Sequence, residues 1–229
     1  VDATLGRMVA FGLPLAVSGL GLWMMNFVDR LVIGHFMSAS ALGLYGSVYG
    51  WAGLLLAVNS ALNLPLYPRL MKAMATGGPL AMGPEVSVFH RYAVLGLVPG
   101  MILLICVMKP LILVMGGSAF RVQVFLVACI VIATFLDQWN ASAQYILMCV
   151  DKVVYTQNAW LITGILNGVA NWFIVPRYGL NGAGAVTVVT FIVLEGAVFL
   201  KATQYCPLLR HYRFDVSWKA LAACLPGTA

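Results

Sequence analysis

The sequence predicts an all-α, polytopic membrane protein built as a bundle of six transmembrane helices. The 229 residues are 62% hydrophobic and 9% charged, with a mean hydropathy of +0.95. That leaves too few polar side chains to cover a water-soluble globule of this size. Apolar runs of about 20 residues are long enough, at 1.5 Å per residue, to cross a hydrocarbon core of roughly 30 Å. Strands of alternating apolar and polar residues are absent from the sequence, which favours helices over a membrane barrel.

Short polar connectors separate six apolar runs of spanning length. The runs cover residues 8–27, 41–62, 92–115, 122–148, 153–175 and 180–200. We expect residues 1–201 to form one six-helix lobe, and 202–229 to form a cytoplasmic amphipathic tail or the start of a truncated further span. Because the chain begins at Val1 and ends soon after a new apolar stretch begins, we also expect it to be a fragment. No secretory signal peptide is recognisable, because the first run is long enough to span.

The positions of the prolines predict kinks in two of the helices and one long loop. Pro14 in the first run, and Pro99 and Pro110 in the third, predict kinks. The connector 63–91 is rich in proline and glycine and is predicted to be the longest loop. Two interpretations of this loop are open: its first part lies in the membrane interface with Arg69 and Lys72 among the headgroups, or it is an ordinary polar loop.

The basic residues are unevenly distributed when six spans alternate between the two sides. Nine lie on one side and four on the other. The larger set is Arg7, Arg69, Lys72, Arg91, Lys152, Lys201, Arg210, Arg213 and Lys219, and the smaller is Arg30, Lys109, Arg121 and Arg177. The positive-inside rule then predicts that both ends of this chain are cytoplasmic. Anionic lipid headgroups and this asymmetry account for the net charge of +6, so no nucleic-acid partner is expected.

Ionisable side chains inside spans are costly, and they usually face a bundle interior or a wet cavity. The first run closes on Asn26, Asp29 and Arg30, at spacings that share one helix face. The acid and base are interpreted either as an ion pair at a helix end or as ligand contacts.

Two further carboxylates lie inside predicted spans. Asp137 lies near the middle of the fourth run, with Asn140 and Gln144 on the same face, and Glu195 lies in the sixth. Each carboxylate either lines a cavity or is protonated within the bundle.

The fifth run carries a polar stripe at successive intervals of four residues, formed by Thr163, Asn167 and Asn171. Such a stripe more often joins helices by hydrogen bonds than lines a transport path, and both alternatives are kept.

Neither a metal centre nor a catalytic site is predicted. Five cysteines and three histidines are scattered, without the spacing of a metal site or a disulfide framework. Serine-hydrolase, zinc-protease, phosphate-loop and paired-aspartate patterns are also missing. We therefore expect no cofactor, and a transporter rather than an enzyme.

Two segments resemble a known family. The first contains Leu13-Pro14, Asp29-Arg30 and Gly43-Leu44-Tyr45, and it is similar to the seventh helix and following loop of Wzx-type polysaccharide flippases. These belong to the multidrug/oligosaccharidyl-lipid/polysaccharide exporter superfamily. The second segment, 171–190, is similar to the joint between the fifth and sixth helices of a lobe in that family. By itself it also reads as a helical hairpin around Pro176, Gly179 and Gly182.

The resemblance implies the C-terminal lobe of a two-lobe transporter in the bacterial inner membrane. Its cargo would be a polyprenyl-pyrophosphate-linked oligosaccharide, moved by alternating access with proton or sodium coupling. The lobe's partners would be the missing N-terminal lobe and membrane lipids. The implied roles are binding of the pyrophosphate or of an acidic sugar by Arg30, sugar binding by Asn26, Asn140, Gln144, Asn167 and Asn171, and ion coupling by Asp137, Glu195 or Asp29.

Other functions remain compatible with the sequence. A cation-coupled drug antiporter of the same superfamily would share the fold and use a carboxylate as its ion site. A lipid-linked sugar polymerase would need a large extracytoplasmic loop, whereas the loops on that side are short. A non-transporting scaffold subunit is a further alternative.

Overall fold

The computed structural model describes residues 2–116, 122–207 and 209, and gives only the backbone of residues 2–18, 62, 115 and 116. All regular structure in these ranges is helical. The helices are α1 (Asp2–Phe36), α2 (Ala39–Ala52), α3 (Leu54–Gly77), the short 3₁₀ helix η1 (Pro79–Met82), α4 (Gly83–Gly116), α5 (Val124–Trp139), α6 (Ala141–Cys149) and α7 (Val153–Tyr205). Most of the predicted tail, at 202–229, lies outside the described residues.

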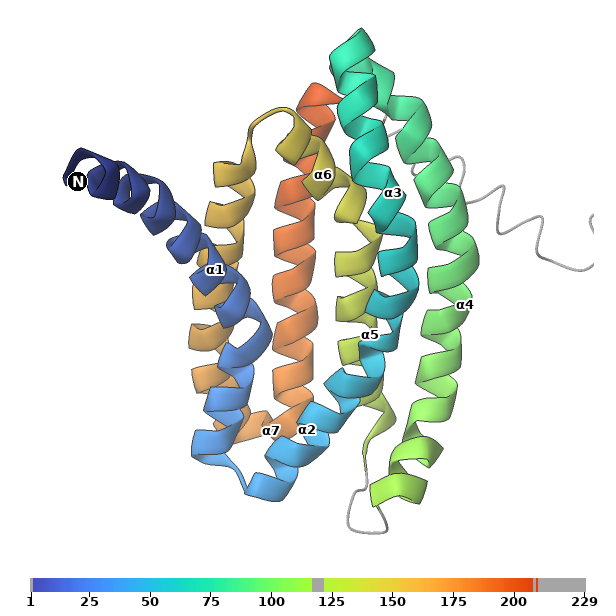
Figure 1. Cartoon of the computed structure of the whole chain (residues 1–229). Helices are drawn as coiled ribbons and strands as arrows, with labels where there is room; N and C mark the ends of the chain where they lie inside the picture. The colour runs from blue at the N-terminus through green and yellow to red at the C-terminus, as the bar shows by residue number, and fades with distance from the viewer. Residues whose placement is uncertain (1, 117–121, 208, 210–229) are drawn as a thin grey trace, which may run out of the picture.

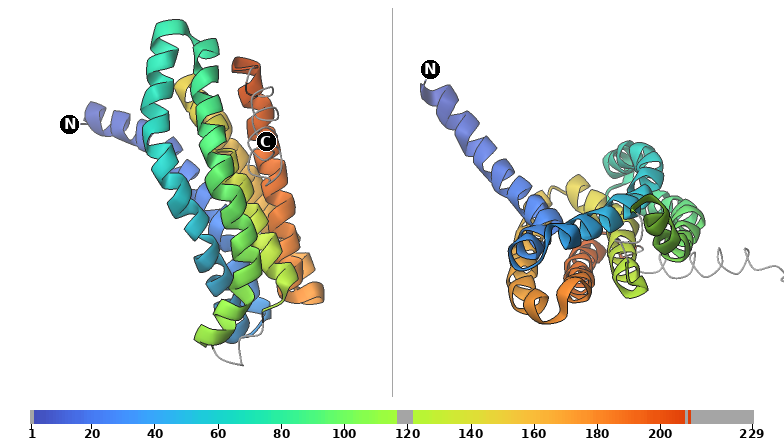
Figure 2. Two further views of the ribbon diagram at one scale, coloured as in Figure 1. Left: turned by 90° about the vertical axis from the view of Figure 1, so that its right-hand side faces the viewer. Right: turned by 90° about the horizontal axis from the view of Figure 1, so that it is seen from below.

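The chain runs up and down through one bundle of long helices (Figures 1 and 2). In the view of Figure 1, α1 descends, α2 and α3 ascend, α4 descends, α5 and α6 ascend, and α7 turns back on itself. Four helical segments of the described chain are long and apolar enough to cross a membrane: Ala39–Ala61, Pro79–Val114, Val124–Cys149 and Val153–Tyr205. The chain is therefore a multi-pass membrane protein, and the part of it that the structure describes is all-helical.

The 53-residue α7 is a hairpin of two antiparallel arms that meet at Gly179. Gly179 has φ 59° and ψ −146°, a conformation that residues with a Cβ rarely adopt. Two hydrogen bonds join the arms: Asn167 Nδ2 donates to Thr190 Oγ1 (2.9 Å), and Tyr155 Oη donates to the Ala197 carbonyl (3.3 Å). The hairpin predicted around this glycine is confirmed.

The predicted loop 63–91 is wrong, because helices occupy most of it. α3 continues through Pro65 and Pro68 as far as Gly77, and α4 begins at Gly83. Both prolines lie on the exposed face of α3, while Leu66 and Leu70 pack into the core. The packed inner face maintains the helix although two backbone donors are missing.

The first helix extends well beyond the predicted end at residue 27 and reaches Phe36. Asp29 and Arg30 therefore lie inside α1 rather than at its end, and Arg30 does not belong to a connecting loop. The predicted fourth span is also interrupted, because Asn140 separates α5 from α6. The predicted second span is divided at Gly53 between α2 and α3.

Close contact between α1 and the first arm of α7 depends on three glycines. A Cβ added at Gly21 would lie 2.7 Å from the Leu161 backbone nitrogen, and one at Gly164 would lie 2.9 Å from Met24 Cβ. A Cβ at Gly168 would lie 3.0 Å from a Val28 methyl group. Gly164 and Gly168 are four residues apart, the spacing at which small residues let helix backbones approach in membranes.

This contact predicts a position-specific effect of adding one methyl group. Gly164→Ala forces α1 away from α7, and we expect it to destabilise the protein by about 1–3 kcal/mol, the usual cost of overpacking. Thermal unfolding of the purified chain in detergent would measure the loss. Gly196→Ala is the matched control, because a Cβ there meets nothing within 4 Å. An equal effect of the two substitutions would contradict a tight α1–α7 contact.

Candidate functional site

Asp29 is the centre of the first of two buried polar clusters. Its carboxylate is fully buried, and the Tyr45 hydroxyl from α2 donates to Oδ2 at 2.5 Å. Tyr49 donates to the same oxygen at 3.4 Å, and the Arg30 backbone N–H donates to Oδ1 at 2.7 Å. Thr187 of the second α7 arm lies 3.2 Å from the Tyr45 hydroxyl. This set, the Asp29 cluster, connects α1, α2 and α7 through neutral donors.

The neighbouring Arg30 guanidinium contacts aromatic rings instead of a carboxylate. Its Cζ lies 4.8 Å from the ring centroids of both Phe27 and Tyr49, within the range of a cation–π contact. Within the described part of the chain, Arg30 Nε is buried without a hydrogen-bond partner, and the single ion pair is Arg69–Glu85 at 3.7 Å. The Asp29–Arg30 ion pair, one of the two interpretations of these residues, is therefore not formed.

The second cluster surrounds the break between α5 and α6. Asn140 Nδ2 donates to both the carbonyl (3.0 Å) and the Oε2 atom of Glu195 on the second α7 arm. Gln144 Nε2 reaches Glu195 Oε1 at 3.4 Å. Each carboxylate oxygen thus has an amide donor from the α5–α6 region, so this contact ties α7 to the broken span.

Polar contacts extend from this break toward α3 and α4. Gln138 donates to Asp137 Oδ2 at 2.6 Å, and Asn59 of α3 donates to the carbonyl and Oε1 atoms of Gln138, both at 3.0 Å. Ser142 Oγ lies 3.4 Å from Nε2 of the buried His90 on α4. Side chains from five helices therefore meet around residues 137–144, and we call this group the α5–α6 cluster.

The stripe on α7 forms contacts inside the hairpin. Thr163, Asn167 and Asn171 are all buried. Besides the bond from Asn167 to Thr190, Asn171 Nδ2 donates to the carbonyl and Oδ1 atoms of Asn167, both at 3.0 Å. These contacts correspond to the first of the two interpretations of the stripe, in which it joins helices.

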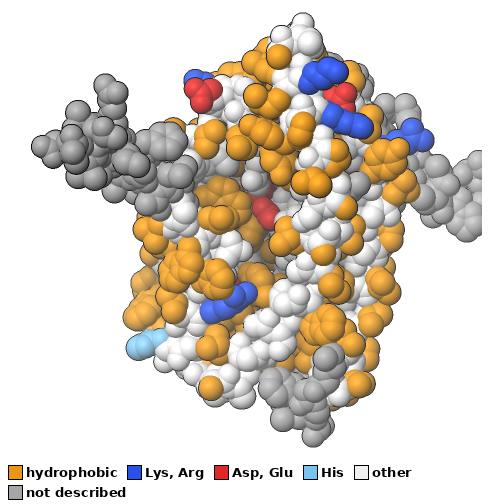
Figure 3. Space-filling model, in the orientation of Figure 1, with side chains coloured by type: hydrophobic (Ala, Val, Ile, Leu, Met, Phe, Trp, Pro, Cys, Tyr) orange, Lys and Arg blue, Asp and Glu red, His pale blue; other side chains and the backbone are white. Residues whose placement is uncertain are grey.

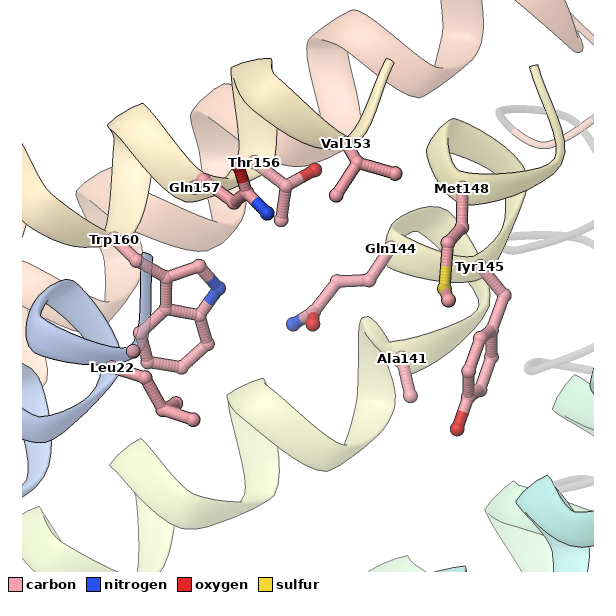
Figure 4. A pocket seen from close by; sticks show the side chains of 10 residues that line it. Leu22, Ala141, Gln144, Tyr145, Met148, Val153, Thr156, Gln157 and Trp160 are labelled. Carbon is pink, nitrogen blue, oxygen red and sulfur yellow. The ribbon is translucent and has the colours of Figure 1, made fainter. Parts of the chain in front are cut away.

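A cavity of about 430 Å³ lies next to the α5–α6 cluster, between α1, α6 and the first arm of α7. Figure 4 shows the Gln144 amide extending into it toward Trp160, with Thr156 and Gln157 on α7 at one side and Tyr145 at the far end. The remaining lining residues are Gly19, Leu22, Ala141, Met148 and Val153. Figure 3 shows a hollow at the centre of this face, with an acidic side chain inside it.

The structure distributes the predicted site residues over three places. Asp29 and Arg30 lie at the first cluster, and Asp137, Asn140, Gln144 and Glu195 meet at the second, of which Gln144 lines the cavity. Asn167 and Asn171 lie inside the α7 hairpin. Asn26 lies apart from these groups, and its amide donates to the Leu22 carbonyl of its own helix at 2.8 Å.

Several partners of these residues could not be singled out from the sequence. Tyr45 and Tyr49 donate to Asp29, Thr187 contacts the Tyr45 hydroxyl, and Trp160, Thr156 and Gln157 line the cavity. The four-residue spacing of Tyr45 and Tyr49 was an available signal, because it places both hydroxyls on one face of α2. Threonine, tryptophan and glutamine in apolar runs carry no comparable signal, because they are also ordinary core and interface residues.

No group of three potential metal-binding side chains occurs in the searched ranges 2–116, 122–207 and 209. Basic side chains on the face shown in Figure 3 gather near one end of the bundle. That end includes the joint between α3 and α4, where Arg69 pairs with Glu85. A collection of basic side chains at one end is the arrangement that the positive-inside pattern predicts.

The Asp29 cluster predicts a large effect of a single hydroxyl. Tyr45→Phe removes a donor to a buried carboxylate, and we expect a loss of about 1.5–3 kcal/mol in unfolding free energy. The exposed Tyr178→Phe, measured in the same thermal-unfolding experiment, is the control. A double-mutant cycle with Asp29→Asn isolates the pair; additive effects, within about 0.3–0.5 kcal/mol, would show that the two side chains are not coupled.

Comparison with known proteins adds one match. Residues 2–141, more than half of the chain, match the family model described as polysaccharide biosynthesis protein. The match covers α1 to α5 and so includes Asp29, Tyr45 and Tyr49 of the Asp29 cluster, but α7, with Thr187 and the segment 171–190, lies outside it. No curated protein and no solved structure matches the chain. With its helical spans, the chain belongs to the family of polysaccharide biosynthesis proteins and is a multi-pass membrane member of it.

Proposed function

We propose that the chain is one lobe, the C-terminal one, of a Wzx-type flippase that moves a polyprenyl-pyrophosphate-linked oligosaccharide across the cytoplasmic membrane. The proposal includes six spans with both ends cytoplasmic, a second lobe outside this chain, and alternating access between the two lobes. We also propose that the protein is a transporter and not an enzyme. Membership in a polysaccharide biosynthesis family supports the choice of cargo.

The observation that carries the proposal is the environment of Arg30. Its positive charge is held between Phe27 and Tyr49, while the adjacent carboxylate of Asp29 is occupied by tyrosine hydroxyls. An arginine that lacks a carboxylate partner keeps its planar donors for a phosphate, which it can bind through two parallel hydrogen bonds.

The depth of Arg30 is also appropriate for this ligand. Six residues separate it from the end of α1 at Phe36, or about 9 Å along the helix axis. His35, Phe36 and Trp172 stack together at that end, as aromatic residues do near a membrane interface. A lipid-linked pyrophosphate occupies the same headgroup region, so its charge can reach Arg30 without crossing the bilayer centre.

The buried carboxylates are the candidates for coupling to a proton or a sodium ion. Asp137 and Glu195 are close to one another through Gln144, which interacts with both side chains. Glu195 and Asn140 join α7 to the α5–α6 break, so a change in charge there would alter a contact between helices. The amides of Asn26, Asn140, Gln144, Asn167 and Asn171 are the proposed contacts for sugar hydroxyls. Of these, Gln144 lines the cavity, whereas Asn140, Asn167 and Asn171 would have to exchange their present hydrogen bonds for contacts with the sugar.

A flipping assay of the full-length protein, with expression held equal, tests these roles. Loss of charge-assisted hydrogen bonds should make transport by Arg30→Ala at least about tenfold slower. Asp137→Asn should also impair transport, because the amide cannot take up or release the coupling ion. Arg177→Ala and Asp151→Asn are the matched controls, since both residues are exposed.

The outcomes separate the alternatives. Unimpaired transport by both Arg30→Ala and Asp137→Asn would remove these residues from the mechanism. A deletion strain that keeps its surface polysaccharide but becomes sensitive to cationic drugs would instead identify a drug antiporter of the same superfamily.

A further inference from the structure

We propose that a groove between α3 and α4 binds one molecule of phosphatidylethanolamine, a zwitterionic phospholipid with a primary ammonium group. The groove is a cavity of about 270 Å³ that side chains of both helices line, and we call it the α3–α4 groove. The inference goes beyond the proposed function and does not depend on it. It requires only that the chain crosses a membrane, so that phospholipids surround these two helices.

The α3–α4 groove has a charged end and an apolar end. Its lining residues repeat at helical spacings: Ala61, Pro65 and Arg69 on α3, and Glu85, Val88 and Tyr92 on α4. The two helices lie side by side and antiparallel (Figures 1 and 2). Arg69 and Glu85 therefore share the end near η1, and Ala61 and Tyr92 share the other end.

The two ends of the groove match two layers of a bilayer. On α3, the apolar segment Ala39–Ala61 ends where the groove begins. Arg69 lies eight residues farther along, about 12 Å along the helix axis. On α4, the apolar segment Pro79–Val114 has 36 residues, about 54 Å, so part of it extends beyond a hydrocarbon core of roughly 30 Å. The apolar end of the groove therefore lies at the edge of the core, and the charged end lies among the headgroups.

Arg69 and Glu85 attract one another but remain accessible to a ligand. Nη1 of Arg69 lies 3.7 Å from Oε2 of Glu85, which is too far for a hydrogen bond. Their side chains are 59% and 34% exposed, so a molecule outside the helices can reach both. Figure 3 shows an acidic side chain between basic ones near this end of the bundle. The site thus offers one cation and one anion side by side.

A headgroup that carries a phosphate and a primary ammonium complements this pair. The Arg69 guanidinium can bind the phosphate through two parallel hydrogen bonds. The ammonium group has three N–H donors for the Glu85 carboxylate. Two methylene groups separate the two charges of phosphatidylethanolamine, so the four charges of lipid and protein can alternate in sign.

Other phospholipids match only half of the site. Phosphatidylglycerol has the phosphate but no cation, and the Glu85 carboxylate would repel it. Phosphatidylcholine has a quaternary ammonium without an N–H group to donate. A free phosphate or a soluble amine would leave the apolar walls uncovered, whereas an acyl chain covers Val88 and Tyr92, which are 43% and 56% exposed. The apolar end of the groove therefore favours a lipid, and the charged end favours phosphatidylethanolamine.

Native mass spectrometry of the full-length protein tests the inference. The protein, in detergent, is titrated with phosphatidylethanolamine, phosphatidylglycerol or phosphatidylcholine that carry identical acyl chains. The first molecule of phosphatidylethanolamine should bind about two- to fivefold more tightly than the first molecule of either other lipid. That ratio is the effect of one exposed ion pair.

Charge substitutions identify the contacts. Glu85→Gln should lower the affinity for phosphatidylethanolamine to that for phosphatidylcholine, and it should raise the affinity for phosphatidylglycerol because a repulsion is removed. Arg69→Ala should weaken the binding of all three lipids, since each has a phosphate. Arg91→Ala and Asp151→Asn, which are exposed and lie outside the groove, are the matched controls. Both should retain the preference of the wild-type protein.

A substitution that fills the groove tests the apolar end without changing a charge. Ala61→Phe places a ring where the acyl chain would lie, so it should weaken the binding of all three lipids. Leu56→Phe, on an exposed part of α3 outside the groove, is the control. Thermal unfolding without added lipid shows whether each variant is folded. Should Ala61→Phe fail to fold, Val88→Phe replaces it.

Two results would overturn the inference. Equal affinities of the wild-type protein for the three lipids would mean that the groove makes only ordinary contacts with the bilayer. A preference for phosphatidylethanolamine that persists in Glu85→Gln and in Arg69→Ala would place the selective site elsewhere on the protein.

Discussion

Hydrogen bonding of buried polar side chains across helices is the constraint on which the rest of the structure depends. The second arm of α7 provides one partner in three of these contacts: Thr187 for Tyr45, Thr190 for Asn167 and Glu195 for Asn140. Lipid offers neither water nor polar groups to compensate an unpaired donor, so these contacts fix how the arm is rotated. In the view of Figure 1 the arm lies between the first arm of α7 and α5, and its opposite face, which includes Val189, Ile192 and Val193, is exposed.

The same constraint explains why adjacent residues of opposite charge have different surroundings. Asp29 faces α2 and α7, where two tyrosine hydroxyls and a backbone N–H satisfy its oxygens. Arg30, one residue later, is rotated by about 100° around α1 and so meets aromatic rings instead. A carboxylate satisfied inside the protein leaves its basic neighbour available for an external anion, and that separation is the basis of the proposed phosphate contact.

Glycine-mediated packing then determines the shape of the cavity. Gly21, Gly164 and Gly168 let α1 and the first arm of α7 approach closely along part of their length. The cavity lies at the end of this contact nearer the start of α7, where Gly19 and Leu22 of α1 face Thr156 and Trp160 across the space. A close contact at one end and the α5–α6 break at the other therefore leave a partly open volume, lined mainly by apolar surface.

The sequence by itself determined the membrane class, the helical secondary structure, the hairpin at Gly179 and the positions of the buried acids, because hydropathy and glycine chemistry are local properties. It did not determine that α3 continues through Pro65, since packing on the opposite face of that helix outweighs the lost hydrogen bonds. Nor could it pair Asn140 with Glu195 or bring Gly19 opposite Trp160. Only the tertiary structure decided those contacts, because they join residues 55 or more positions apart and depend on the rotation of each helix.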